Sequence, residues 1–146
     1  MLLDDHGHQM CHEVLYSSTG VLRYSRGTVG YRLVVNIDPE ITRYYRSLVP
    51  KWIKLNAQMY PPHISVVRHE VPVCLEAWGK YEGERVTYQY SPVIHHGEVY
   101  WWLNVFATRL EEIRVDLGLP VSSMYTRPPD GYAKVFHTTL GNTKSI

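Results

Sequence analysis

Two short segments of the sequence each contain a histidine followed two positions later by a hydroxyl residue. They are His63-Ile-Ser65 and His137-Thr-Thr139. An imidazole has an ordinary pKa of about 6.5, so it can accept or donate a proton near neutral pH. A hydroxyl can donate a hydrogen bond to a phosphate oxygen as negative charge builds up there. Two such pairs in one place could bind a phosphodiester and move protons on both sides of it, without a metal ion.

Both segments are predicted to be β-strands, because each is a short run of Ile, Val, Phe, Thr or Leu bounded by Pro or Gly. Side chains two positions apart on a strand share a face, so each imidazole has a hydroxyl neighbour on its own side. If the two strands lie side by side, all four side chains converge on one small volume. A lone buried histidine is usually structural, so it is the duplication that favours catalysis.

A strand and a helix are predicted before the first histidine strand. Residues 31–37 form an apolar run typical of a strand. Asp38 is expected to be the N-cap of a helix, with Pro39 at its first position, and Pro50 ends that helix. Residues 1–19 show no clear pattern and are expected to be an irregular segment.

The second half of the chain is predicted to follow the same order. Residues 85–91 and 99–105 are expected to form a hairpin. A capping-box pattern at residues 108–111 then predicts a helix start, and Gly118 is expected at its C′ position. A polar, proline-rich loop leads from this helix to the second histidine strand.

The repeated order predicts an α+β fold in a single domain spanning residues 1–146. Two lobes, at about residues 20–70 and 84–146, are expected to be related by a pseudo-twofold axis. Each lobe would carry an antiparallel sheet beside a central cleft, with the helices outside. If the apolar residues of the strands pack on the helices, the residues alternating with them face the cleft. These are Asn36, Tyr100, Trp102 and Asn104.

Composition excludes several other classes of protein. The net charge of +1 gives no global field for gripping duplex DNA. No run of about 18 apolar residues is present, so no membrane span is expected. Cys11 and Cys74 form no spaced motif, and no secretory signal is evident, which favours the cytoplasm. Residues 17–60 hold seven basic residues against two acidic ones, a local surface that could attract a small anion.

Metal binding is the first alternative. One group of candidate ligands crowds the N-terminus: His6, His8, Cys11 and His12. Its spacing matches no closed ligand set. A second group is His63, His69, His95 and His96, for which Glu70 and Glu98 are the available carboxylates. Such a set would make a metal-dependent hydrolase, but we expect no metal and no other cofactor. A non-catalytic binder of nucleotides or RNA ends is the other alternative.

The pair of motifs resembles the 2H (two-histidine) phosphoesterase superfamily, which is defined by two His-x-Ser/Thr motifs on strands of a bilobal α+β fold. The resemblance in layout covers roughly residues 20–142. It implies metal-independent cleavage of a phosphodiester, with His63 and His137 as acid and base and with Ser65 and Thr139 contacting the phosphate. Ser65 departs mildly from the more usual threonine but keeps the hydroxyl.

Three segments are further similar to a phage branch of this superfamily: Tyr44-Tyr-Arg-Ser-Leu-Val-Pro-Lys51, Pro62-His-Ile-Ser-Val-Val-Arg68 and Tyr100-Trp-Trp-Leu-Asn-Val105. Members of that branch degrade the cyclic-oligonucleotide signals of a bacterial immune system (anti-CBASS phosphodiesterases). The similarity implies hydrolysis of cyclic di- or trinucleotide second messengers in the host cytosol. RNA 2′,3′-cyclic phosphodiesterase activity in RNA processing or repair remains an alternative.

A cyclic oligonucleotide carries flat bases that stack on aromatic side chains. The chain contains twelve Tyr and four Trp against two Phe, and both common types combine stacking area with a polar group. Strand alternation makes Trp102 the best expected platform, together with Tyr100, while Tyr24 is expected to approach from the N-terminal edge. The other interpretation is that Trp102 fills a core.

Overall fold

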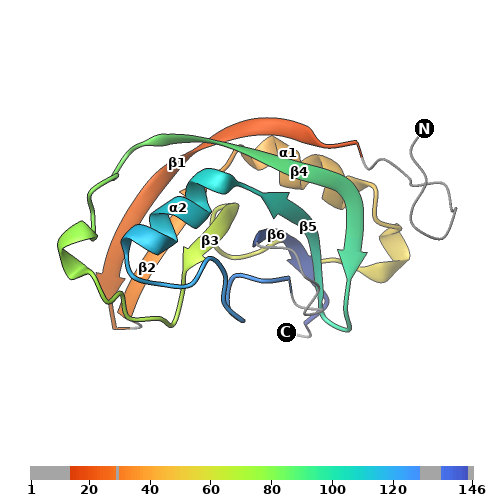
Figure 1. Ribbon diagram of the computed structural model, residues 1–146. Helices are drawn as coiled ribbons and strands as arrows, with labels where there is room; N and C mark the ends of the chain where they lie inside the picture. The colour runs from red at the N-terminus through yellow and green to blue at the C-terminus, as the bar shows by residue number, and fades with distance from the viewer. Residues whose placement is uncertain (1–13, 29, 129–135, 145–146) are drawn as a thin grey trace, which may run out of the picture.

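The computed structural model describes residues 14–28, 30–128 and 136–144 (Figure 1). In chain order these residues form β1 (Tyr16–Gly27), β2 (Gly30–Asn36), α1 (Pro39–Ser47), β3 (His63–Val67), β4 (Arg85–His96), β5 (Tyr100–Phe106), α2 (Thr108–Asp116) and β6 (Phe136–Asn142), with short 3-10 turns at Lys51–Ile53 and Leu75–Ala77. The order strand, strand, helix, strand therefore occurs twice. No helix in the described part of the chain is long and apolar enough to cross a membrane.

The strands form one closed antiparallel barrel in the order β1-β2-β3-β6-β5-β4. The α+β class is confirmed, but the expected two sheets are joined into one. The joint is β1, which pairs with β2 on one side and with β4 on the other, and Figure 1 shows β1 and β4 as long arches over the molecule. β1 begins at Tyr16, inside the segment that was expected to be irregular. Its first residues are polar and largely exposed, so they show no apolar alternation that would predict a strand.

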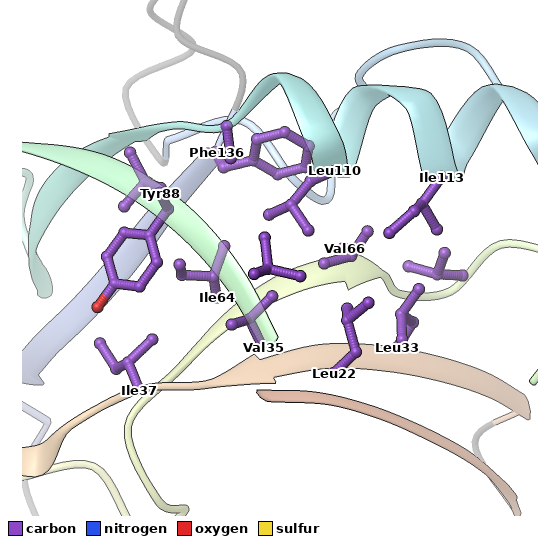
Figure 2. Packing of buried hydrophobic residues seen from close by; sticks show 14 of the residues in the cluster. Leu22, Leu33, Val35, Ile37, Ile64, Val66, Tyr88, Leu110, Ile113 and Phe136 are labelled. Atoms are coloured by element: carbon purple, nitrogen blue, oxygen red, sulfur yellow. The ribbon is translucent and has the colours of Figure 1, made fainter. Parts of the chain in front are cut away.

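The core lies on the inner face of this barrel and contains residues from all six strands and from α2. Figure 2 shows Leu110 and Ile113 of α2 pointing toward Val66 of β3 and Leu33 of β2. A smaller cluster joins Tyr45 of α1 to Leu103 of β5 and Leu140 of β6. Both helices thus contribute residues to the core face of the sheet.

The ends of the helices follow local sequence signals in part. The side chain of Asp38 accepts a hydrogen bond from the backbone N–H of Glu40 at 3.0 Å, which confirms the predicted N-cap. α2 instead begins after Ala107, with no side-chain cap, so the predicted capping box starting at Thr108 is wrong. Gly118 follows the last turn of α2 with φ of 78°, as expected of a C′ glycine.

A buried ion pair fixes α2 to the end of the first histidine strand. Arg114 has no exposed side-chain surface and binds both carboxylate oxygens of Glu70, at 2.9 and 2.8 Å. It also donates to the backbone carbonyls of Val66, at 2.8 Å, and Pro120, at 2.7 Å. These acceptors offset the cost of burying the charge and the N–H groups of Arg114, so this side chain can hold α2, β3 and the segment at Pro120 together.

Candidate active site

The two histidine strands are neighbours in the barrel. Ile64 of β3 lies directly opposite Thr138 of β6. The hydroxyl of Thr138 donates a hydrogen bond to the backbone carbonyl of His63 at 2.9 Å, so the middle residue of the second motif holds the backbone of the first. Ile64 and Thr138 are both buried on the core face.

This register places all four motif residues on the outer face of the barrel. In an antiparallel pair, the positions on either side of Ile64 and Thr138 put His63 across from Thr139 and Ser65 across from His137. The two histidines then occupy diagonal positions, with Cα atoms about 7–8 Å apart. The register therefore brings together, on one face of the barrel, the four residues predicted from the sequence.

Each imidazole is held by a backbone carbonyl. His63 Nδ1 lies 2.8 Å from the carbonyl oxygen of Pro61, and His137 Nδ1 lies 3.1 Å from that of Thr126. Because a carbonyl only accepts, these bonds assign the proton of a neutral ring to Nδ1 and leave the lone pair on Nε2. Backbone anchors of this kind carry no residue signature, so sequence reasoning missed both.

The surroundings of His63 favour its neutral form. Burial lowers the pKa of His63 below its ordinary value of 6.5, and the positive charges of Arg32 and Arg68 lower it further, against the opposing effect of the hydrogen bond to Pro61. Arg32 lies on β2, where alternation places it on the same outer face as Asn36. His63 is therefore poised to accept a proton at neutral pH.

An asparagine stands beside each histidine. Asn36 of β2 is opposite His63, and Asn104 of β5 is opposite His137. Both asparagines therefore lie on the face predicted for them. Asn36 is exposed, whereas Asn104 is buried and its side-chain oxygen accepts a hydrogen bond from Nε1 of Trp102 at 3.2 Å.

Trp102, which was expected to be an aromatic platform for a base, is buried in the structure. Trp102 is opposite Thr139 on the predicted face, but it has no exposed surface and lies against the ring of His95, with centroids 6.0 Å apart. Its indole is closed off by packing and hydrogen bonding, so Trp102 is not an open stacking surface. Tyr100 is partly exposed, with the Lys144 ammonium 5.0 Å from the centre of its ring.

Tyr24 is not brought to the histidines. It is opposite Leu33 in the β1–β2 pair, and thus on the core side of the sheet. Its ring packs edge-to-face on Trp78, with centroids 4.9 Å apart. Burial raises the pKa of its phenol to about 12. The side chain belongs to the edge of the core rather than to the histidine face.

Sequence reasoning missed a cavity of about 170 Å³ that borders the site. It is lined by Pro39, Thr42, Arg43 and Arg46 of α1, by Ala57, Gln58, Tyr60, Pro61 and Pro62 of the following segment, and by His63, Thr139 and Leu140. The α1 residues recur at positions i, i+3, i+4 and i+7, which is one helix face. The excess of basic residues between 17 and 60 was the available signal, but it did not single out Arg43 and Arg46.

One wall of this cavity depends on a close approach of two chain segments. Asn56 and Asn142 exchange backbone hydrogen bonds of 2.8 and 2.9 Å. A Cβ atom at Gly141 would collide with the carbonyl of Asn56, so glycine is needed here. Asn142 also donates from its side chain to Oε1 of Gln58 at 2.7 Å, which fixes that amide at the cavity.

The alternative metal site is not assembled by the described residues, among which no group of three His, Cys, Asp or Glu could hold a metal ion. His95 lies against Trp102 and His96 stacks on Trp101, while His69 contacts Tyr125. The N-terminal group of histidines and Cys11 lies outside the described residues.

Comparison of the chain with protein-family models, with curated proteins and with solved structures gave no match. A function must therefore be inferred from the residues and the geometry of the site. The main features are four motif side chains on one face, two anchored imidazoles and an adjoining basic cavity.

Proposed function

We propose that this protein is a metal-independent phosphodiesterase that hydrolyses cyclic di- or trinucleotide second messengers by two-histidine acid–base catalysis. The observation that carries the proposal is the shared outer face of His63, Ser65, His137 and Thr139, which follows from the pairing of β3 with β6. A general acid and a general base on either side of one phosphate are what cleavage of a phosphodiester requires.

In the proposed reaction Nε2 of neutral His63 takes a proton from a water molecule as its oxygen attacks phosphorus. The bond between phosphorus and the leaving ribose oxygen breaks, and Nε2 of charged His137 gives its proton to that oxygen. Ser65 and Thr139 donate hydrogen bonds to the non-bridging oxygens, where charge builds up. Proton exchange with solvent then returns both imidazoles to their starting forms.

The assignment of His63 as the base is supported by its lowered pKa and by its Nδ1 hydrogen bond to Pro61. The lowered pKa favours a neutral ring, and the hydrogen bond leaves the lone pair of that ring on Nε2, which is the form a base requires. The acid role then falls to His137 on the opposite side of the phosphate.

We include a 2H-type bilobal arrangement in the proposal. Its support is the order strand, strand, helix, strand in each half. In addition, each histidine lies opposite an asparagine of the neighbouring strand: Asn36 is paired with His63, and Asn104 with His137. In this interpretation the pseudo-twofold axis passes between β3 and β6, and the protein acts in a host cytosol against CBASS signals.

The test is incubation of the purified protein with a panel of cyclic di- and trinucleotides and of RNA 2′,3′-cyclic phosphates, with product analysis by mass spectrometry. We expect hydrolysis of a cyclic oligonucleotide that survives excess EDTA and is lost in His63→Ala. His96→Ala, which removes an exposed histidine stacked on Trp101, is the matched control and should retain activity.

Other outcomes would reassign the function. Activity lost on chelation and restored by zinc or manganese would contradict the two-histidine scheme. Cleavage restricted to RNA 2′,3′-cyclic ends would identify an RNA-processing phosphodiesterase. Binding of nucleotides without turnover would identify a non-catalytic module.

A further inference from the structure

The basic cavity adjoins one histidine and not the other. Its lining includes His63 and Thr139, which face each other across β3 and β6, whereas Ser65 and His137 are not among its described lining residues. A ligand group in the cavity would therefore lie on the far side of His63 from His137. It must be joined by a short link to a phosphate held between the two imidazoles.

The lining of this cavity is suited to an anion. Two guanidinium groups, Arg43 and Arg46, line it together with the side-chain amide of Gln58, and no carboxylate is among its described lining residues. Arginine offers five N–H donors in a rigid fork that matches the oxygens of a phosphate. The cavity thus presents concentrated positive charge and hydrogen-bond donors beside the reacting group.

Arg46 is the better placed of the two arginines. Its Nη1 donates to the carbonyl of Leu140 at 3.2 Å, which holds the guanidinium against β6. Among the described residues no carboxylate forms an ion pair with Arg46, so none of them neutralises its charge. Arg43 is more exposed and pairs with Glu40 on the surface of α1, so its contribution should be smaller.

We propose that this cavity is a subsite for a second phosphate group of the substrate, bound by Arg46 and assisted by Arg43. The subsite would make the enzyme select substrates with two or more phosphates, such as cyclic dinucleotides, over 2′,3′-cyclic mononucleotides with one. This inference rests on the proposed phosphodiesterase function and specifies its substrate class.

The experiment compares kcat/KM for cyclic di-AMP and for 2′,3′-cyclic AMP, and the measured quantity is the ratio of the two. Hydrogen bonds to charged groups contribute about 1.5–3 kcal/mol, so Arg46→Gln should lower this ratio about 10- to 100-fold. Arg43→Gln should lower it less, and Arg46→Lys should fall between wild type and Arg46→Gln. Arg23→Gln changes an exposed side chain of β1 that does not line the cavity, so it is the matched control and should leave the ratio unchanged.

An unchanged ratio in both Arg43→Gln and Arg46→Gln would overturn the subsite. Arg46 also supports the backbone at Leu140, so the melting temperature of each variant is measured. If Arg46→Gln does not fold, the ratios for Arg46→Lys and Arg43→Gln decide the question.

A binding measurement separates failure of the subsite from failure of the proposed function. Titration calorimetry compares adenosine 3′,5′-bisphosphate with adenosine 3′-monophosphate on the wild-type protein and on Arg46→Gln. Tighter binding of the bisphosphate that is lost in Arg46→Gln supports the subsite even if neither cyclic substrate is cleaved. Equal affinity of the wild type for the two ligands would overturn it, whether or not the protein is an enzyme.

Discussion

The two histidine motifs hold matching places in the chain but differ in their surroundings. His63 is anchored by the carbonyl of Pro61, two residues before it, and lies beside Arg32 and an open basic cavity. His137 is anchored by Thr126, 11 residues before it. Its neighbour Asn104 is buried with Trp102.

Under the proposed function, this difference would give the repeated motif two roles. The pairing of β3 with β6 gives the two imidazoles matching positions, but their described neighbours differ. The His63 side borders the basic cavity (the open side), whereas the β5 residues beside His137 and Thr139 are buried (the closed side). The side of His63 is suited to binding an anion and accepting a proton. The β5 residues Asn104 and Trp102 are buried, so substitutions of these two residues should change stability more than binding.

The largest effect should come from removing either imidazole, which tests whether the two motifs are equally necessary. His63→Ala and His137→Ala should each lower kcat by about 10²–10⁴-fold, because each removes one proton transfer. The double variant should be little worse than either single one, since the pair acts as a unit. Steady-state kinetics with circular dichroism as a folding control provides the check, and substantial activity in either single variant would contradict the scheme.

The hydroxyls should matter less than the imidazoles. Ser65→Ala and Thr139→Ala should each lower kcat by roughly one to three orders of magnitude, because each removes a hydrogen-bond donor to the charge that develops on the phosphate oxygens. Thr139→Ser and Ser65→Thr keep the hydroxyl and serve as matched controls that should retain most activity. Loss of activity in those controls equal to that in the alanine variants would show that side-chain packing, not hydrogen bonding, is at work.

The closed side of the site should respond mainly in stability. Trp102→Ala should lower the free energy of unfolding by about 3–5 kcal/mol, because it empties a fully buried site. Trp52→Ala is the matched control, since Trp52 is 80% exposed and should change stability by less than about 0.5 kcal/mol. Urea denaturation measures both. If Trp102→Ala instead had normal stability but bound nucleotides weakly, Trp102 would be a stacking platform rather than a core residue.

Substitution of the two asparagines should show the same contrast between buried and exposed residues, with smaller changes in the free energy of unfolding. Asn104→Ala removes the acceptor of the buried Trp102 Nε1, which should cost about 1–3 kcal/mol of stability. Asn36→Ala affects an exposed side chain and should change stability by less than about 0.5 kcal/mol. Equal effects of the two substitutions would remove the distinction between an open and a closed side.

Much of the fold could be predicted because its signals are local. Alternation along residues 31–37 and 99–105 identified the core face, and Asp38 marked the start of α1 by its own side-chain hydrogen bond. Closure of the barrel could not be predicted. It depends on β1 pairing with β4, about 70 residues away in the chain, and the polar start of β1 has no apolar alternation.

The four motif residues of the candidate site could also be predicted, because their signal is local. The spacing of His63 and Ser65, and of His137 and Thr139, placed each pair on one face once the segments were taken as strands. The placement of Arg43 and Arg46 at the cavity was not predictable, because the orientation of α1 is set by the packing of Tyr45 on Leu103 and Leu140. The burial of Trp102 likewise results from contacts between strands, which periodicity does not reveal.

The smallest expected effect concerns pH and sharpens the contrast between the histidines. The base must be neutral, and the folded protein holds the pKa of His63 below 6.5, mainly by burial and further by Arg32 and Arg68. The acidic limb of the kcat/KM profile should therefore lie below pH 6.5. Arg32→Gln removes one of the charges that disfavour the imidazolium, so it should move this limb to higher pH.

The pH dependence of the free energy of unfolding should follow from the same lowered pKa of His63. A depressed pKa means that the unfolded chain binds a proton at His63 before the folded protein does. The neutral imidazole thus contributes stability above about pH 6.5, and this contribution is lost as the pH falls through the folded pKa. Arg32→Gln should reduce this loss, whereas Arg23→Gln, which is not among the charges acting on His63, should leave both profiles in place. An acidic limb that does not move in Arg32→Gln would mean that it reports a group other than His63, and the assignment of His63 as the base would then fail.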